Sequence, residues 1–342
     1  MSVELVEVTA ADAVAVREWA AVSAASQAHE VGDAATPWAA EELLALLRHP
    51  PVKRRERLWV AREAGVAVGT AWLSVPLMDN LDAAEVDLHV RPDRRRRGIG
   101  SLLLDHLEAV AAAEGRVRLD AEAQWPEAGS PQGAGVVGVD FLRARGYTFG
   151  IGDVQRSAAL PLDDDVLAAL AADAAPHHRD YRIESWAGRV PDALVEGWLA
   201  VASTLMTEAP TGAMEREAEA VDVAGHRDDE ALLAAQGRVP WCTVALDRTG
   251  EVVAYTQLVV PSYDDRSVFQ WGTLVRRDHR GHRLGTAVKV ANHRALQAGA
   301  DVSGRRVVTW NAEENGPMIA INELLGFVPT ARLAEMQKRL DR

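Results

Sequence analysis

A short basic stretch, Arg95–Gly100, begins soon after an apolar run that ends at Val90. Glycine lets the backbone approach a ligand closely and adopt φ values that other residues avoid. Where a helix begins, its first N–H groups have no partners inside the helix, and the positive end of the helix dipole favours an anion there. Neighbouring arginines add charge-assisted hydrogen bonds. The stretch therefore predicts a pyrophosphate-binding loop; a capped helix beside a solvated arginine run is the alternative.

The same pattern recurs in the second half of the chain. Residues 58–104 align without a gap on residues 243–289, a shift of 185 positions that places Gly100 on Gly285. Apolar and turn residues agree along the whole stretch, and such internal repetition indicates two copies of one domain. The length of 342 residues also favours two domains, because it exceeds what one hydrophobic core usually serves.

Each copy is expected to place its basic loop between a strand and a helix. Apolar runs bounded by turn residues predict strands, and apolar residues spaced by three and four predict helices. In the first copy we expect strands at 3–8, 58–62, 69–75, 85–90 and 117–121, and a helix from Asp12 to about Gln27. In the second copy we expect strands at 181–186, 243–246, 252–260, 268–275 and 306–310, and a helix over Pro191–Leu205 with Pro191 in its first turn.

The order of these elements predicts the fold class and the domain boundaries. Helices mixed with a sheet of mostly antiparallel neighbours are typical of an α+β fold, here expected once in each copy. We expect an N-terminal domain at residues 1–160, a linker with a short helix at 161–178 and a C-terminal domain at 179–342.

The first loop resembles a known family signature. Arg95-x-x-Gly98-x-Gly100, preceded by Val90-x-Pro92, is similar to the acetyl-CoA signature of the GNAT superfamily of N-acetyltransferases. The resemblance implies two GNAT folds in tandem, as in mycothiol synthase and actinobacterial enzymes that acetylate natural-product amines. It implies that the loop binds the CoA pyrophosphate and that the preceding strand pairs with the pantetheine amides. The residues implied in the first copy are Leu88, His89, Val90, Arg95, Arg96, Arg97, Gly98, Ile99 and Gly100.

The second copy resembles a variant of that signature. Its loop has Arg283 where the first glycine of the signature stands, but it stays basic and keeps a glycine two positions earlier. The resemblance therefore implies CoA binding in this copy as well. The residues implied are Leu274, Val275, Arg280, Gly281, His282, Arg283, Leu284 and Gly285.

A later motif of the family supplies an asparagine that bonds the CoA arm and a tyrosine that acts as general acid near the thiolate. In the second copy Asn315 matches the asparagine, but Asn322 stands at the tyrosine position. An amide cannot donate a proton to a thiolate, although it can hydrogen-bond to one. In the first copy the two positions hold Gly135 and Leu142, so both functional groups are missing there.

The later motif is better preserved in the second copy, whereas the candidate general bases on the strand before the loop occur in the first copy. A protonated amine is not nucleophilic, and a nearby carboxylate can accept its proton. The first copy has Glu85 and Asp87 on the strand before the loop, on one face of it. The second copy has Gln270 and Gly272 there, so its candidates are Tyr263, Asp264, Asp265, Glu313 or water. Each carboxylate has a solvated sheet face or turn as its alternative. The second copy is favoured as the working site, because Asn311 and Asn315 flank the expected path of the CoA arm.

Bulk properties exclude several other classes. The net charge of −13 argues against a nucleic-acid surface and against binding to anionic membranes. No apolar run is long enough for a membrane helix, the first residues do not form a signal peptide, and we predict no metal site. The single cysteine, Cys242, lies in an apolar run and fits a buried residue in a reducing compartment, so we expect a cytoplasmic protein.

The sequence thus predicts an acetyl-CoA-dependent transfer to a primary amine of a small acceptor in a ternary complex. A cationic acceptor is suggested by acidic residues before the second hairpin, unless these only solubilise the surface. They are Glu208, Glu215, Glu217, Glu219, Asp222, Asp228, Asp229 and Glu230. The alternatives are a non-catalytic CoA-binding module and a mycothiol-synthase-like enzyme that acts on a cysteinyl sugar. The oligomeric state is not predicted.

Overall fold

The computed structural model describes residues 3–340; residues 1, 2, 341 and 342, at the ends of the two predicted domains, lie outside the described part. The chain divides into two compact units. The first contains the residues up to Val154, Thr211–Arg216 and the residues from Thr330 onward, and the second contains Gln155–Pro210 and Glu217–Pro329. The predicted boundaries at residues 160 and 179 stay predictions, because compactness does not test which segments fold independently.

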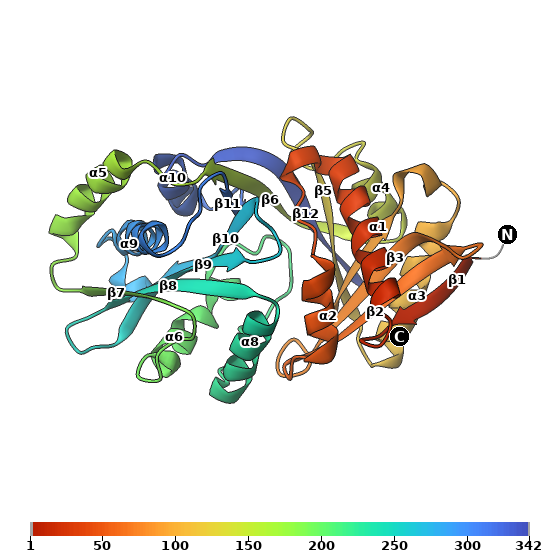
Figure 1. Cartoon of the computed structure of the whole chain (residues 1–342), viewed down its shortest axis with the longest axis horizontal. Coiled ribbons are helices and arrows are strands. Elements are labelled where there is room, and N and C mark those ends of the chain that lie inside the picture. Colours follow the sequence, from red (N-terminus) through yellow and green to blue (C-terminus); the bar gives the residue numbers. More distant parts are fainter. Residues whose placement is uncertain (1–2, 341–342) are drawn as a thin grey trace. The chain divides into compact units, whose positions relative to one another are not determined.

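The first unit is built on a mixed sheet (Figure 1). Its strands follow the order β1 (Val3–Val8), β2 (Arg54–Glu63), β3 (Val66–Pro76), β4 (Ala83–Val90), β5 (Arg118–Pro126) and β12 (Val328–Arg339). The β4–β5 pair is parallel, whereas β1–β2, β2–β3, β3–β4 and β5–β12 are antiparallel. Its helices are α1 (Ala13–Val31), α2 (Ala40–Arg48), α3 (Ile99–Ala113) and α4 (Val137–Ala144).

The second unit repeats this plan. From the end of β6 (Thr148–Ala159), its strands follow the order β11 (Arg306–Ala312), β10 (Ser267–Val275), β9 (Val252–Pro261), β8 (Arg238–Leu246) and β7 (Arg182–Ala187). The β10–β11 pair is parallel, and β7–β8, β8–β9 and β9–β10 are antiparallel. Its helices are α5 (Asp164–Ala174), α6 (Val195–Ala202), α7 (Leu205–Glu208), α8 (Val223–Ala235), α9 (Leu284–Gly299) and α10 (Gly316–Leu324).

The predicted α+β fold is confirmed in both units, and most predicted strands agree with the structure to within a few residues. One helix start was wrong. The helix expected from Pro191 begins at Val195, because Pro191 instead opens a turn closed by a hydrogen bond from the Leu194 N–H to the Pro191 carbonyl (2.9 Å). One strand end was also wrong, because β5 continues past Ala121 to Pro126.

The sequence did not reveal α2, β6 or β12. The last strand, β12, pairs along its length with β5, so the final strand of the second copy belongs to the first unit. This pairing places Glu122 opposite Glu335 and Asp120 opposite Gln337. A repeat of two self-contained copies gives no hint of it, since the partners lie more than half the chain apart.

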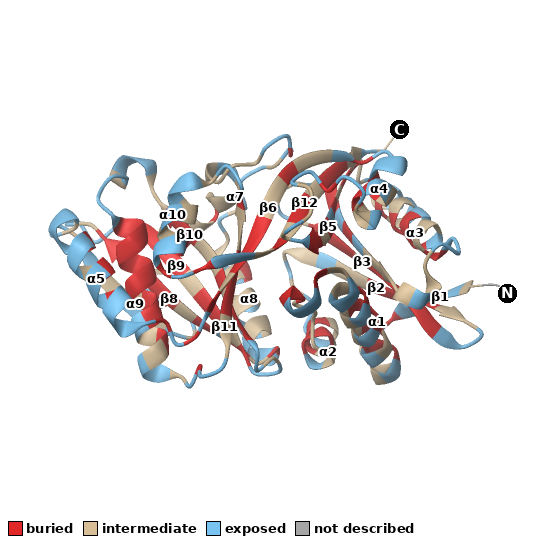
Figure 2. Cartoon of the chain, turned by 90° about the horizontal axis from the view of Figure 1, so that it is seen from above, coloured by how far each residue is buried: buried red, intermediate tan, exposed pale blue. Residues whose placement is uncertain are grey.

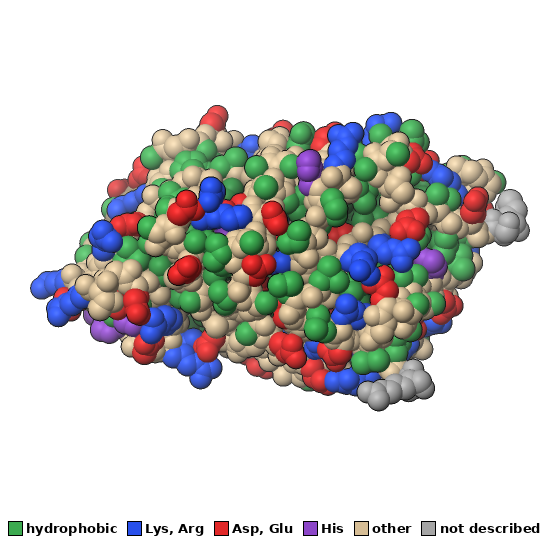
Figure 3. Space-filling view, turned by 90° about the horizontal axis from the view of Figure 1, so that it is seen from below, with side chains coloured by type: hydrophobic (Ala, Val, Ile, Leu, Met, Phe, Trp, Pro, Cys, Tyr) green, Lys and Arg blue, Asp and Glu red, His purple; other side chains and the backbone are tan. Residues whose placement is uncertain are grey.

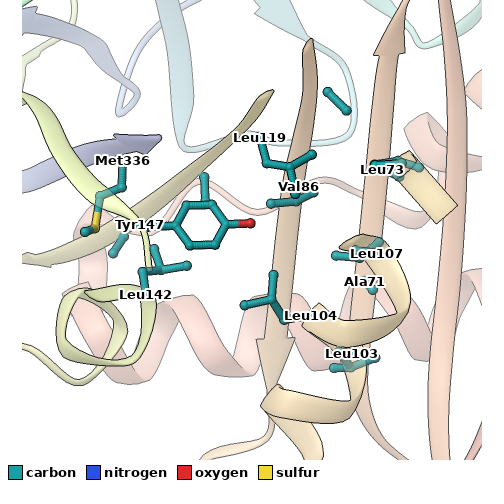
Figure 4. Packing of buried hydrophobic residues seen from close by; sticks show 14 of the residues in the cluster. Ala71, Leu73, Val86, Leu103, Leu104, Leu107, Leu119, Leu142, Tyr147 and Met336 are labelled. Carbon is teal, nitrogen blue, oxygen red and sulfur yellow. The ribbon is translucent and has the colours of Figure 1, made fainter. Parts of the chain in front are cut away.

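The sheet of the first unit is packed on both faces. On one face α1 and α2 cover Leu58 and Val60 of β2, and on the other face α3 packs against the alternating residues of the same strands. Figure 4 shows the core on the α3 face of this sheet, in which the Tyr147 ring lies among leucine side chains such as Leu119 and Leu142. Tyr147 is a core residue, and burial raises the pKa of its phenol, which therefore stays protonated near neutral pH.

Helix α9 of the second unit is buried along much of its length (Figure 2). It carries a lysine, Lys289, that is 1% exposed and forms no ion pair with a described residue. Its Nζ lies 5.6 Å from the centre of the Phe327 ring. Burial lowers the pKa of Lys289 from 10.5 to about 7. One turn later His293 is fully buried, with neither ring nitrogen bonded to a described residue; burial, then the charge of Lys289, lowers its pKa to about 3.

Replacing this lysine should stabilise the protein. Because the folded chain holds Lys289 with a pKa near 7 and the unfolded chain with one near 10.5, the unfolded state binds more protons between these values, and stability rises with pH across that window. Each unit of such a shift corresponds to about 1.4 kcal/mol. Lys289→Met should therefore raise the midpoint of thermal unfolding at pH 7, and the gain should shrink towards pH 10. A gain that is equal at both pH values would contradict the buried neutral amine.

Candidate active site

The loop of the first unit has the backbone that its glycines predict. It passes through a short 3-10 helix, Pro92–Arg94, and then through two left-handed residues, Arg96 (φ 63°) and Gly98 (φ 82°). Helix α3 begins at Ile99, and no side chain caps its first turn. The N–H groups of that turn point out of the helix and are available to an anion. The predicted pyrophosphate loop therefore fits an anionic ligand.

The loop of the second unit has the same backbone with the glycine exchanged. Its left-handed residues are Gly281 (φ 89°) and Arg283 (φ 53°), and no side chain caps α9. These positions correspond to Arg96 and Gly98, so each copy places glycine at one left-handed position and arginine at the other. The departure of Arg283 from the signature therefore leaves the loop shape unchanged, at the conformational cost of a side chain in the left-handed region.

This exchange predicts opposite stability effects at one structural position. A Cβ added to Gly98 meets no atom within 4 Å, so Gly98→Ala should cost only the backbone term, about 1 kcal/mol. Arg283→Gly should gain a similar amount, since the Arg283–Asp173 ion pair it removes is about half exposed and worth little. Urea unfolding measures both changes. Destabilisation by Arg283→Gly would show that the side chain, and not the backbone, decides the stability of this loop.

The first arginine of each loop shapes the loop. Arg95 donates from Nε to the Val90 carbonyl (3.2 Å) and forms an ion pair with Glu30. Arg280 likewise donates to the Val275 carbonyl (3.2 Å), and its Nη2 donates to Glu208 (2.9 Å). Both guanidinium groups thus tie the loop to the end of the preceding strand.

The remaining basic residues differ between the loops. In the first loop, Arg96 and Arg97 are exposed beside the start of α3. In the second loop, His282 Nδ1 lies 3.3 Å from the His177 carbonyl, and Arg283 forms an ion pair with Asp173. Arg97 also lies 4.0 Å from Glu63, so the first loop offers a pyrophosphate mainly the exposed Arg96 and the partly engaged Arg97.

Strands β4 and β5 separate midway, which leaves an open edge before the first loop. They pair only where Ala83–Val86 faces Arg118–Ala121, whereas β4 continues along β3 as far as Val90. The edge of Asp87–Val90 that faces away from β3 therefore has no partner strand among the described residues. Unpaired backbone groups of this kind bind a ligand that carries amides. Leu88, His89 and Val90, predicted to contact pantetheine, lie on this edge.

Strands β10 and β11 separate in the same way. They pair only where Ser267–Phe269 faces Arg306–Val308, so Leu274 and Val275 lie beyond the fork. Here β10 also has a bulge between Gln270 and Thr273, which β4 lacks. A bulge leaves backbone N–H groups free to polarise a carbonyl.

The face of β10 at this bulge is filled by apolar side chains. A Cβ on Gly272 would lie 2.2 Å from the Tyr255 hydroxyl and 2.8 Å from a Leu205 methyl. Gln270 is 3% exposed and donates to the Thr256 hydroxyl (3.1 Å) and the Gln257 carbonyl (2.8 Å). Neither residue at the positions of Glu85 and Asp87 therefore presents a group that accepts a proton.

Two of the predicted asparagines of the second unit, Asn311 and Asn322, are hydrogen-bonded to each other, and the third, Asn315, stands at the start of α10. Asn322 is fully buried and donates to Asn311 Oδ1 (2.7 Å), while its own Oδ1 has no partner among the described residues. Asn315 stands at the N-cap position of α10, but its side chain makes no capping hydrogen bond there. Glu313 is exposed in the turn after β11.

The two predicted carboxylates of the first unit already have partners. Glu85 forms an ion pair with Arg54 (2.8 Å). Asp87 Oδ2 lies 3.3 Å from His89 Nε2. Burial alone would raise the pKa of Asp87, but the charge and hydrogen bond of His89 outweigh it and the pKa is lowered. Burial alone would lower the pKa of His89, but the charge and hydrogen bond of Asp87 outweigh burial, and the pKa is raised. The pairing therefore favours the charged forms of both side chains.

A third carboxylate, Glu122, was missed from the sequence. It lies on β5, one residue beyond the predicted strand end at Ala121, and its side chain is exposed. Crowding by surrounding protein, followed by the charges of Asp87, Glu85 and Asp153, raises its pKa to about 7. The alternation of Asp120, Glu122 and Gln124 with apolar residues was the signal in the sequence, since it marks one polar face of a longer strand.

Comparison with known proteins identifies the first copy. Residues 19–126 match the family described as the acetyltransferase (GNAT) family. This segment of the chain is similar to a GNAT domain. This match includes β4, the loop, the start of α3 and β5 with Glu122. No curated protein sequence matches the chain.

Solved structures extend this identification to a tandem GNAT fold. A tandem GNAT protein from the clavulanic acid biosynthesis pathway, solved without acetyl-CoA, is 27% identical with a TM-score of 0.78, over 100% of this chain and 99% of that one. A GCN5-related N-acetyltransferase from Sphaerobacter thermophilus is 15% identical (TM-score 0.63; 98% and 95% covered). Another from Kribbella flavida is 15% identical (TM-score 0.51; 99% and 71% covered). The last two show the fold alone; together with the family match, the comparisons support acetyltransferase activity in general.

Two further observations concern the helices and one face of the protein. No helix among residues 3–340 is long and apolar enough to cross a membrane. On the face shown in Figure 3, acidic and basic side chains are interspersed, without the continuous basic surface that phosphate backbones require.

Proposed function

We propose that the protein is an acetyl-CoA-dependent N-acetyltransferase that acts on a primary amine of a small, cationic acceptor, by direct attack within a ternary complex. The observation that carries the proposal is the continuity of two binding features in the first unit. The open edge Asp87–Val90 leads directly into the loop and the uncapped start of α3 at Ile99. An extended arm with amides and a pyrophosphate at one end is complementary to this surface.

The same order of features exists in the second unit, and the sequence favours that copy. The contacts of the side chains favour the first. Only the first unit has carboxylates at its fork, and its loop keeps Arg96 and Arg97 exposed. The family match also falls within residues 19–126. We therefore assign the transfer to the first unit, with a structural or regulatory role for the second.

A cationic acceptor is supported by the carboxylates around the fork of the first unit, since an acidic surface attracts cations. The acidic segment that precedes the second hairpin gives less support, because several of its carboxylates bond to the protein itself. Glu215 pairs with Arg339, Asp222 caps α8, and Glu230 bonds to Arg227 and the Val190 N–H. We propose a cytoplasmic setting, which suits the buried, unreactive thiol of Cys242, whose pKa burial raises to about 12.

One observation favours a non-catalytic CoA-binding module instead. At the position of the general-acid tyrosine, Leu142 is 5% exposed and part of the hydrophobic core. Acyl transfer nevertheless depends largely on holding amine and thioester together, so that a missing acid does not exclude turnover.

The proposal is tested by following thiol release from acetyl-CoA with a panel of primary amines. The wild-type protein should release CoA faster with at least one cationic amine than without acceptor. Tight CoA binding without turnover of any amine would instead identify the binding module. A cysteinyl sugar belongs in the panel, since preferred turnover of that acceptor would identify a mycothiol-synthase-like enzyme.

Charge reversal at matched loop positions tests which unit transfers the acetyl group. Arg97 and His282 occupy equivalent, exposed positions. Hydrogen bonds to charged groups are worth about 1.5–3 kcal/mol, so Arg97→Glu should raise the Michaelis constant for acetyl-CoA roughly tenfold or more. His282→Glu should raise it less. A larger increase in this Michaelis constant for His282→Glu than for Arg97→Glu would indicate that the active site lies in the second unit.

A further inference from the structure

We infer that Glu122 accepts the proton of the acceptor ammonium at the fork of the first unit, so that the neutral amine attacks the thioester. The inference rests on the proposed function and adds to it the residue that activates the acceptor. Every group that carries it lies within the first unit: Glu85, Asp87, Asp120, Glu122, Asp153, Arg216 and Glu335.

The strand register places Glu122 at the fork itself. The last paired residues of β4 and β5 are Val86 and Ala121, so Asp87 and Glu122 are the first residues on each strand after they part. Residues two apart on a strand share a face, and residues opposite in a ladder do so as well. Because Glu85 pairs with Asp120, Glu122 lies on the same face as Glu85 and Asp87. The open edge for the CoA arm begins at this point.

Glu122 differs from the neighbouring carboxylates in having no partner. Glu85 is paired with Arg54, and Asp87 with His89. Asp120 accepts a hydrogen bond from Gln337 Nε2 (2.8 Å). Glu122 forms neither a hydrogen bond nor an ion pair with any residue in the described range 3–340, and its side chain reaches solvent. Of these carboxylates it is the one that is free to meet an ammonium group.

The charges around Glu122 suit it to take up and release a proton near neutral pH. Crowding by protein and the charges of Asp87, Glu85 and Asp153 favour its protonated form. The opposing cation, Arg216, is held by Glu335, which lies opposite Glu122 on β12. A base is most effective when its pKa lies near the working pH, because it is then partly ionised and still basic enough to accept a proton.

The second unit has no equivalent group. Gln270 and Gly272 replace Glu85 and Asp87, and β11 contains no carboxylate along Arg306–Ala312. Both units therefore contain the fork, but only in the first do these strands carry a carboxylate beside it.

The acceptor ammonium gives one proton to the Glu122 carboxylate, and the freed nitrogen lone pair forms a bond to the thioester carbonyl carbon. The tetrahedral adduct collapses with cleavage of the C–S bond, and the electron pair leaves with the CoA sulfur. The thiolate takes the second proton of the former amine, which gives the amide and CoA thiol. Glu122 then releases its proton to solvent through its exposed side.

The test compares the pH profiles of kcat/KM for the wild type and Glu122→Gln with an ammonium acceptor. Wild-type activity should fall on the acid side with an apparent pKa near 7. Glu122→Gln should lose about 100-fold or more at neutral pH, and its rate should rise towards the pKa of the acceptor itself. With an acceptor whose amine is already neutral at the assay pH, the loss should be much smaller. Glu122→Asp should restore part of the activity.

The variant Arg216→Met distinguishes a proton-accepting role of Glu122 from a purely structural one, because only the first role predicts a change in the pH profile. Since Arg216 lowers the pKa of Glu122, its removal should shift the acid side of the wild-type profile to higher pH. Glu4→Gln, an exposed carboxylate on β1, is the matched control and should leave the profile unchanged.

Two results would overturn the inference and are distinguishable from each other. If the wild type transfers acetyl groups but Glu122→Gln keeps its acid-side pKa, or loses activity equally with ammonium and neutral amines, the assignment of Glu122 is wrong and the proposed function stands. If the wild type turns over no amine while it binds CoA, the proposed function falls and the inference falls with it.

Discussion

Every part of the proposed site depends on the point at which β4 leaves β5. Backbone N–H and C=O groups that lack a partner strand must bond to something else, because leaving them unpaired in a crowded environment costs about 1–3 kcal/mol each. At Asp87–Val90 the structure maintains such groups because β4 continues along β3 after its pairing with β5 has ended, while β5 stays paired with β12 along its length. The open edge, the loop that follows it and the carboxylate across the fork are consequences of that one divergence.

The two strands part in both units, but the side chains around the fork differ between the units. The first unit surrounds its fork with acidic side chains, of which Glu85 and Asp87 are paired, whereas Glu122 has no such partner among residues 3–340. The second unit covers the corresponding face with Tyr255 and Leu205 and adds a bulge in β10. One copy thus carries proton-accepting groups and the other an apolar, closely packed surface. This difference supports the proposed assignment of the transfer to the first unit.

Local spacing was sufficient to predict the fold class, the repeat and the two loops, since glycine, arginine and alternating apolar residues report directly on nearby backbone. The exchange of glycine between the positions of Gly98 and Arg283 needed φ angles, because an arginine in a left-handed conformation has no local signature. Glu122 was missed because its strand was ended one residue early. Its neighbours Asp153, Arg216 and Glu335 come from distant segments, and no single-sequence pattern brings these together.

The central claim is that the fork of the first unit holds the reacting thioester. A crystal structure with CoA bound, solved together with a non-reactive acetyl-CoA analogue and an amine, tests this claim most directly. The account predicts pyrophosphate at the start of α3, the CoA arm along Leu88–Val90 and the acyl end beside Asp87 and Glu122. Occupancy of the α9 loop alone, with the fork of the first unit empty, would contradict it.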